Sequence, residues 1–333
     1  MASLRAALER IGVRAEDGLR GALESHPSSL RELLRVATLP QPRLDDLEPD
    51  EDDADAFESF ELEDPQGIVY GGGRRWFLAS QYTIRRIRIE GDDPFRPNDV
   101  VHGPSRHIDE LLDEADLPRD YDHLGDLGFR DSVIYIPIRR SDRQPPHLLM
   151  GLSTDLRVVG WTLLDPATGE STCAVNPWNG LLYLPSLDNS GRLEAYDTSA
   201  FDERREQPTQ WGREISVTRR SADIQLRTPQ GEKDRSGMQG ISFSANGRIY
   251  VTRSLGNGPW NNLIYVYSAL TGRRFGDGRE WDFSGRSDEI EGISIHPSGV
   301  IYVVVADNDP EWIDTDDFDL YTFRFRTLDA SEV

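Results

Sequence analysis

Apolar residues recur with a helical period at the start of the chain. Leu4, Ala7, Leu8 and Ile11 have the i, i+3, i+4, i+7 spacing that places side chains on one face of a helix. The pattern predicts a short helical N-terminal region over residues 1–42. A region of this length does not bury a core of its own, so it either packs on the main body or docks a partner.

Acidic residues dominate the next stretch, residues 43–65. Twelve of the twenty residues from 45 to 64 are Asp or Glu. Repulsion between like charges keeps such a segment extended, so we predict an acidic linker. We also predict that its stretch Phe57–Glu63 pairs with the last repeat of the chain and closes a ring of strands, which removes an exposed sheet edge.

From residue 66 to about residue 328 the pattern changes to short β-branched and aromatic runs separated by Gly, Asn, Asp and Pro. Such spacing is typical of all-β folds. A turn followed by an apolar strand with one aromatic at a fixed place recurs five times, at Trp76, Tyr135, Tyr183, Tyr250 and Tyr302. In three repeats a glycine stands three residues before the tyrosine, where it supplies the turn between two strands: Gly180, Gly247 and Gly299.

Each repeat also has strand-like runs before and after its central strand. Fourth strands are expected at Arg157–Leu164, Glu214–Arg219 and Arg279–Phe283. Four antiparallel strands repeated around an axis make a β-propeller. We therefore predict an all-β fold, a β-propeller of five four-stranded blades over residues 66–328. The long interval 199–236 leaves room for a sixth blade, so six blades stay open.

Composition narrows the classes of protein. The chain has 37 Lys and Arg against 59 Asp and Glu, a formal net charge of −22, which disfavours nucleic-acid partners. No run of apolar residues reaches the ~18–20 needed to span a membrane, and the first residues lack the apolar core of a secretory signal. We expect a cytoplasmic protein with no membrane partner. The single cysteine, Cys173, excludes an internal disulfide.

Two of the repeats resemble a known family. The segments Met238–Val251 (MQGISFSANGRIYV) and Glu289–Asp309 (EIEGISIHPSGVIYVVVADND) are similar to the EGI-type blades of gluconolactonase/regucalcin-like and NHL-like propellers. In gluconolactonase-like members a divalent cation, often calcium, is held in the central channel by Glu, Asn and Asp side chains. The resemblance implies that Glu291 is such a ligand.

Polar residues at the starts of the innermost strands are the candidate site, because these strands line the channel. The candidates are His123, Asp126, Asn176, Gln239, Glu289 and Glu291. Calcium prefers six to eight oxygen ligands, so we predict a metal site from the side-chain oxygens of Asp126, Asn176, Gln239 and Glu291. The alternative is that these groups satisfy backbone and water hydrogen bonds in a wet channel.

A histidine beside a carboxylate is also the arrangement of a general base. His123 with Asp126, or with Glu291 across the channel, is the candidate pair, and a purely structural hydrogen bond is the alternative. Two functions follow. The first is a platform that binds a protein or a small-molecule ligand at the propeller mouth. The second is a calcium-dependent hydrolase of lactonase or phosphoesterase type, with His123 and Glu291 as catalytic residues.

Overall fold

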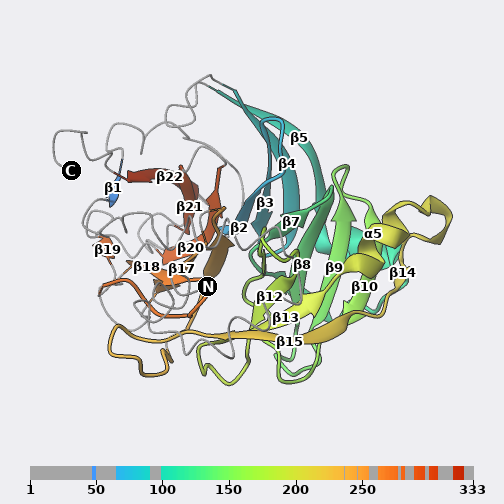
Figure 1. Cartoon of the computed structure of the whole chain (residues 1–333). Coiled ribbons are helices and arrows are strands. Elements are labelled where there is room, and N and C mark those ends of the chain that lie inside the picture. Colours follow the sequence, from blue (N-terminus) through green and yellow to red (C-terminus); the bar gives the residue numbers. More distant parts are fainter. Residues whose placement is uncertain are drawn as a thin grey trace.

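A computed structural model of the chain is all-β with few helices, in a propeller-like arrangement of sheets (Figure 1). It describes residues 47–49, 65–90, 99–235, 237–245, 247–254, 262–276, 279–281, 289–296, 300–306 and 318–325. The predicted helical region 1–42 and the predicted closing strand Phe57–Glu63 lie outside the described residues. Among the residues that are described, no helix is long and apolar enough to cross a membrane.

Four of the sheets are four-stranded blades in which neighbouring strands are antiparallel. The first consists of β2 (Pro65–Tyr70), β3 (Arg75–Ser80), β4 (Thr83–Glu90) and β5 (Asp99–His107). The third consists of β11 (Ala174–Val175), β12 (Leu182–Pro185), β13 (Arg192–Asp197) and β15 (Thr218–Gln225). The fourth consists of β16 (Gly240–Phe243), β17 (Arg248–Ser254), β18 (Asn262–Ser268) and β19 (Arg279–Trp281).

The last sheet joins the two ends of the described chain. Its strands are β20 (Glu289–Ile295), β21 (Ile301–Ala306), β22 (Phe318–Phe325) and β1 (Leu47–Pro49). β1 pairs antiparallel with β22, Leu47 opposite Phe325. An N-terminal strand therefore occupies the fourth place of this sheet, and it comes from residues 47–49 of the acidic segment.

The second sheet has six strands, so the prediction of five or six four-stranded blades is wrong: the described chain has four such blades. Its strands are β6 (Tyr121–Leu124), β7 (Gly128–Arg130), β8 (Val133–Arg140), β9 (Leu148–Ser153), β10 (Val158–Leu163) and β14 (Arg213–Glu214). Both β6 and β7 pair with β8, because the chain leaves the ladder between them. There the backbone N–H of Asp126 donates to the carbonyl of Ser171, which precedes the third sheet, at 2.9 Å.

The interval 199–236 does not form a sixth blade. It contains helix α5 (Ser199–Arg205) and the short helix η3 (Pro208–Gln210), and then adds edge strands to two different sheets. β14 lies parallel to β10, whereas β15 pairs with β13. Because most of β15 is exposed, this strand extends the edge of an existing sheet and does not contribute to a new core.

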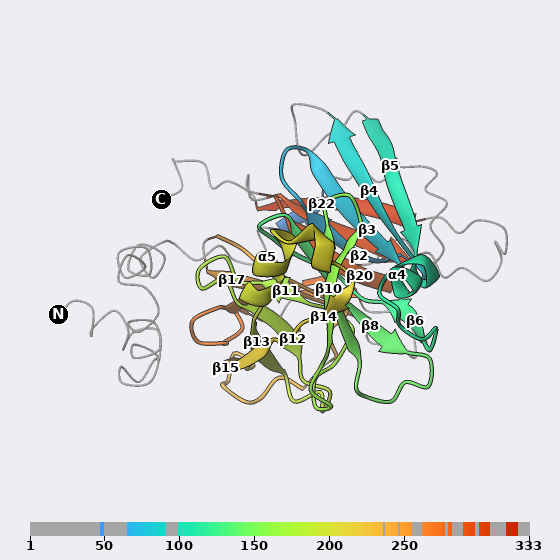
Figure 2. The same cartoon turned by 90° about the vertical axis from the view of Figure 1, so that its right-hand side faces the viewer.

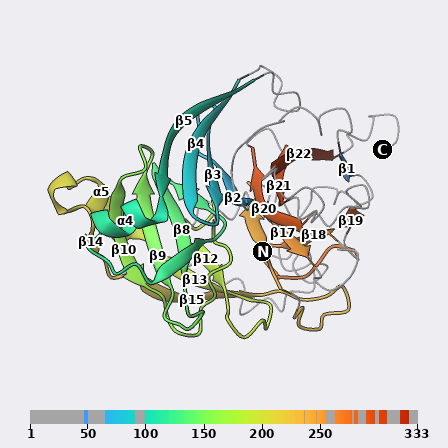
Figure 3. The ribbon, with the colours of Figure 1, turned by 180° about the vertical axis from the view of Figure 1, so that it is seen from behind.

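One strand from each sheet contributes to a closed ring. β2, β7, β11, β16 and β20 contact one another in sequence order, and β20 returns to β2. Figures 1 and 3 show β2 and β20 side by side near the centre of the molecule. The repeated aromatics pack between sheets, as Trp76 does against Tyr302 with ring centroids 4.3 Å apart. The predicted turn glycines Gly180 and Gly247 have φ of 68° and 80°, as a left-handed turn requires.

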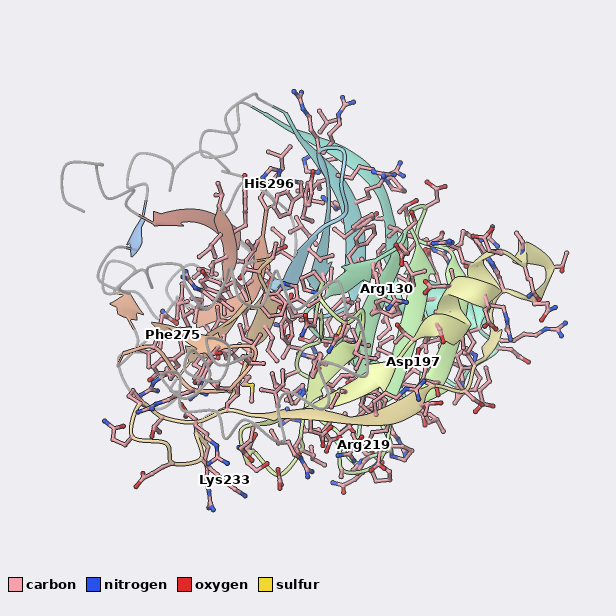
Figure 4. All side chains as sticks on the ribbon, viewed as in Figure 1. Arg130, Asp197, Arg219, Lys233, Phe275 and His296 are labelled. Carbon is pink, nitrogen blue, oxygen red and sulfur yellow. The ribbon has the colours of Figure 1, made fainter. Side chains whose placement is uncertain are left out.

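Two side elements reinforce the second sheet. Helix α4 (Ile108–Glu114) buries Leu111 and Leu112 in the same core cluster as Met150 of β9. Figure 2 shows the helix beside β6 of this sheet. Arg130 (Figure 4), at the end of β7, bonds to the Gly180 carbonyl and pairs with Asp202 of α5. The channel is therefore framed by sheets that are fixed to one another.

Candidate functional site

Three of the ring-forming strands carry the same short sequence at or near their start, a Gln or Glu followed by Gly-Ile. The three copies are Gln66-Gly67-Ile68 in β2, Gln239-Gly240-Ile241 at β16 and Glu291-Gly292-Ile293 in β20. The second and third sheets have a polar residue at the corresponding place. Two residues before the strand partner of the repeated tyrosine lie Asp126 in the second sheet and Thr172 in the third. At the same position the fourth and last sheets have Gly240 and Gly292. The glycines leave the room that the two polar side chains occupy.

Asp126 lies where the ring-forming strands meet. We call the closely packed region formed by Asp126, Gly67, Gly240 and Gly292 the floor of the channel. The Asp126 carboxylate is fully buried, and Oδ1 accepts the backbone N–H of Ile68 at 3.0 Å and of Leu127 at 2.8 Å. Oδ2 accepts the Thr172 hydroxyl and the Ile293 N–H, both at 3.4 Å. Strands from opposite ends of the chain thus meet on one side chain.

The glycines at the floor are held against backbone. A Cβ on Gly292 would lie 2.5 Å from the Gly67 Cα, and a Cβ on Gly67 would lie 2.6 Å from the Asp126 Cα. A Cβ on Gly240 would lie 2.7 Å from the Glu291 carbonyl oxygen. Since real Cβ atoms do not approach backbone so closely, only glycine fits at these positions.

Burial raises the pKa of Asp126 to about 8, although the backbone N–H groups of Leu127 and Ile68 act to lower it. Removing an ionised carboxylate from water costs more free energy than these hydrogen bonds return. Asp126 is therefore mostly protonated at pH 7. A neutral carboxyl group whose oxygens already accept hydrogen bonds is a poor cation ligand and a poor base.

A polar pocket of about 330 Å³ lies at the N-terminal ends of the same strands. Strand residues of the first, second and last sheets line it, together with a turn residue of the first sheet and residues that precede the third and fourth sheets, namely Gln66, Gln81, His123, Arg139, Glu170, Ser171, Gln239, Glu289, Glu291 and Ala306. Four of the predicted candidates are thus brought together: His123, Gln239, Glu289 and Glu291. We call this cavity the mouth pocket.

Gln239 links the two carboxylates of the last sheet. Its Nε2 donates to Glu289 Oε1 at 2.7 Å and lies 3.4 Å from Glu291 Oε1. Glu291 is 7% exposed and therefore largely shielded from water, whereas Gln239 is half-buried. This wall of the mouth pocket offers mainly acceptor oxygens.

His123 lies on the wall formed by the second sheet. Its Nε2 lies 2.9 Å from Gln66 Oε1, and its Nδ1 is buried with no partner among the described residues. Burial, together with the charges of Arg139 and Arg143, lowers the pKa of His123 to about 4, so the ring is neutral at pH 7. With the Nε2 proton donated to Gln66, Nδ1 is left as an acceptor.

The predicted carboxylate partners do not reach this histidine. Within the described chain no hydrogen bond joins His123 to Asp126 or to Glu291, and the Gln66 amide takes that place. Because Gln66 precedes the first aromatic repeat, the sequence pattern gave no sign of it. Its Gln-Gly-Ile context, shared with Gln239, is the signal that would have found it.

Arg139 is the other residue that the sequence did not indicate. It sits on β8, opposite His123 in the strand register, and it lines the mouth pocket. Its Nε is buried without a partner, and no described residue forms an ion pair with its guanidinium. Glu170 lines the same wall, but its Oε2 lies 3.2 Å from His147 Nε2.

Asn176 is separate from the mouth pocket. Its Oδ1 accepts the backbone N–H of Trp178 at 2.9 Å, inside the turn that leads to Gly180. Asp126 is committed to the floor, so the predicted ligands Asp126, Asn176, Gln239 and Glu291 do not converge on one point. In the described ranges no three His, Cys, Asp or Glu residues are grouped so as to hold a metal ion. The residues present do not fit the calcium site that the family resemblance implies.

No protein-family model matches the sequence, and no curated protein matches it. Solved structures with a similar arrangement include the tail fibre of Staphylococcus aureus phage P68, at 13% identity and a TM-score of 0.46 over 81% of this chain and 51% of that chain. A GH43_1 enzyme from Xanthomonas citri has 11% identity and a TM-score of 0.47 over 89% and 92% of the two chains. Virginiamycin B lyase from Staphylococcus aureus has 10% identity and a TM-score of 0.35 over 78% and 69%. With TM-scores below 0.5, these similarities carry no conclusion about activity.

Proposed function

We propose that this protein binds a small polar ligand in the mouth pocket. One observation carries the proposal. The floor is packed backbone against backbone, whereas the next residues of the same strands line a polar cavity. Its volume, about 330 Å³, is at the lower end of the ~300–1,000 Å³ typical of small-molecule sites. A ligand of monosaccharide or amino-acid size suits it.

The chemistry of the lining supports the same proposal. The residues that line the pocket include Arg139, a hydrogen-bond donor, and the carboxylates of Glu289 and Glu291, which are acceptors. Buried polar groups are normally hydrogen-bonded, because an unmatched donor or acceptor costs about 1–3 kcal/mol. A bound polar molecule supplies an acceptor to the guanidinium of Arg139, which has none among the described residues.

The test is binding of small metabolites with and without an obstructed pocket. Saturation-transfer NMR with a mixture of small sugars, amino acids and hydroxy acids should give signals with the wild-type protein. Gln81→Trp, at a half-buried turn on the rim of the pocket, should abolish them. Gln144→Trp, at an exposed turn outside the pocket, is the matched control and should retain them. Equal signals in all three proteins would contradict the proposal.

Hydrolysis at the same pocket is the second candidate, and one observation favours it. His123 lines the pocket and is neutral at pH 7, so it can accept a proton, although its pKa of about 4 makes it a weak base. Turnover of a lactone or a phosphoester that is lost in His123→Gln but retained in His107→Gln, at an exposed site, would establish this activity. No turnover above the rate in His123→Gln would remove it.

The calcium prediction is tested separately by thermal unfolding. A cation that binds only the folded protein raises the melting temperature. A rise with calcium over EDTA that disappears in Glu291→Gln would place a cation at this pocket, in spite of the dispersed ligand set. The same melting temperature in calcium, magnesium and EDTA is the result we expect from the described geometry.

A further inference from the structure

Arg139 is a cation without a counter-ion in the described chain. No described residue accepts a hydrogen bond from its guanidinium, and its Nε is buried without a partner. The next residue, Arg140, is placed differently: its guanidinium lies 3.1 Å from Asp142 and 3.7 Å from Asp120. Since a guanidinium stays charged at any pH the protein meets, leaving it partly desolvated and unpaired costs free energy.

The carboxylates of the mouth pocket do not neutralise Arg139. Glu170, on the same side, faces His147 instead. Glu289 and Glu291 belong to the last sheet, whereas Arg139 belongs to the second sheet, and no ion pair joins them among the described residues. Arg139 therefore lies on one side of the pocket, together with Glu170, and Glu289 and Glu291 lie on the side formed by the last sheet.

A molecule that satisfies both walls has two kinds of group. A carboxylate matches the planar donors of Arg139 with two parallel hydrogen bonds. Hydroxyl or ammonium groups donate to Glu289 and Glu291, which accept but do not donate when ionised. A phosphate dianion fits less well, because its larger charge would face three acidic residues that line the same cavity.

We propose that the mouth pocket takes a small organic acid, whose carboxylate pairs with Arg139 and whose hydroxyl or ammonium groups donate to Glu289 and Glu291. This inference rests on the proposed function of the pocket. It adds the class of ligand and names Arg139 as the residue that selects it.

The test uses three sugars of one shape, glucuronate, glucose and glucosamine, measured by isothermal titration calorimetry. Wild-type protein should bind glucuronate roughly tenfold or more tightly than glucose. Arg139→Gln should remove this preference, so that glucuronate and glucose bind with similar affinity. Arg140→Gln, which removes a paired arginine outside the pocket, is the matched control and should keep the preference.

Arg139→Lys retains the charge but not the two-point geometry, so it should keep part of the preference for glucuronate. A preference that is partly kept also shows that substitution at this position leaves the pocket folded. Equal binding of glucuronate and glucose, sensitive to Gln81→Trp but not to Arg139→Gln, would overturn the carboxylate inference and leave the pocket proposal standing. Preference for glucosamine would overturn it in the same way. Binding of none of the three sugars would count against both proposals.

Discussion

The floor and the mouth of the channel are built from neighbouring residues of the same strands, yet they have opposite chemistry. At the floor, Gly67 and Gly292 pack backbone against backbone, and each Asp126 carboxylate oxygen accepts hydrogen bonds from protein donors. One residue earlier in the chain, Gln66 and Glu291 line an open cavity. Alternation along a β-strand sends successive side chains to different surroundings, so a step of one residue changes a packing role into a ligand-facing role.

The difference separates residues that stabilise the fold from residues that contact a ligand in the proposed function. Floor groups are matched within the protein, so their removal costs stability. In the mouth, Arg139 and the Nδ1 of His123 have no partner among the described residues. Unmatched polar groups reduce stability, and active or binding sites are where proteins retain them.

The largest effect is expected from a methyl group placed in the floor. Gly292→Ala should lower the free energy of unfolding by about 1–3 kcal/mol, because its Cβ would overlap the Gly67 backbone and neither strand is free to move. Urea denaturation measures it. Gly237→Ala, where no atom lies within 4 Å of the added Cβ, is the control and should change stability by less than about 0.5 kcal/mol. Equal effects of the two substitutions would show that the floor is not tightly packed.

The next effect is a dependence on pH. The pKa of Asp126 is about 8 in the folded protein and ~3.9 in an unfolded chain, so between these values only the folded state holds the proton. Stability from this group is therefore present at low pH and falls as pH rises from about 4 to about 8. The free energy of unfolding of wild type minus that of Asp126→Asn should decrease over this range.

Asp188→Asn is the control for that experiment. A hydrogen bond from Ser190, the largest cause, lowers the pKa of exposed Asp188 to about 2. Its contribution is complete above the unfolded pKa and is lost only as pH falls towards 2, so the difference from wild type should be flat between about pH 5 and about pH 8. A flat difference for Asp126→Asn as well would mean that the Asp126 carboxyl is ionised in the folded protein.

A smaller loss is expected at the mouth. Gln66→Ala removes the hydrogen bond to His123 and should cost about 0.5–1.5 kcal/mol, at the low end because water in the pocket can replace the amide. Gln144→Ala, at an exposed turn, should have almost no effect. If Gln66→Ala destabilised the protein as much as Gly292→Ala, the distinction between floor and mouth would not hold.

The sequence pattern predicted the strands well because alternation and turn glycines are local signals. The central strands around Tyr135, Tyr250 and Tyr302 are where the repeat placed them. The expected outer strand Glu214–Arg219 was misplaced, and the third sheet uses β15 at Thr218–Gln225 instead. Pairing of an exposed edge strand depends on its partner β13, which no local pattern specifies.

The candidate site was only partly predictable for the same reason. His123, Gln239 and Glu291 were identified because the starts of inner strands converge in any propeller. Asp126 was placed in the channel, but its burial under Gly67 and Gly292 depends on contacts with residues 59 and 166 positions away. Arg139 lies on a second strand, and it reaches the pocket only because of its register with His123.

The smallest predicted effect is also the most direct measure of the charge in the mouth. The ring resonances of His123, assigned by comparison with His123→Gln, should titrate with a pKa of about 4 in wild type. Arg139→Gln should raise this pKa, because it removes a nearby positive charge, but should leave it below 6.5, because burial is the larger cause of the shift. Arg140→Gln should leave it nearly unchanged. A pKa near 6.5 in the wild-type protein would mean that water reaches His123 freely, and one that stays the same in Arg139→Gln would mean that the guanidinium does not face this pocket.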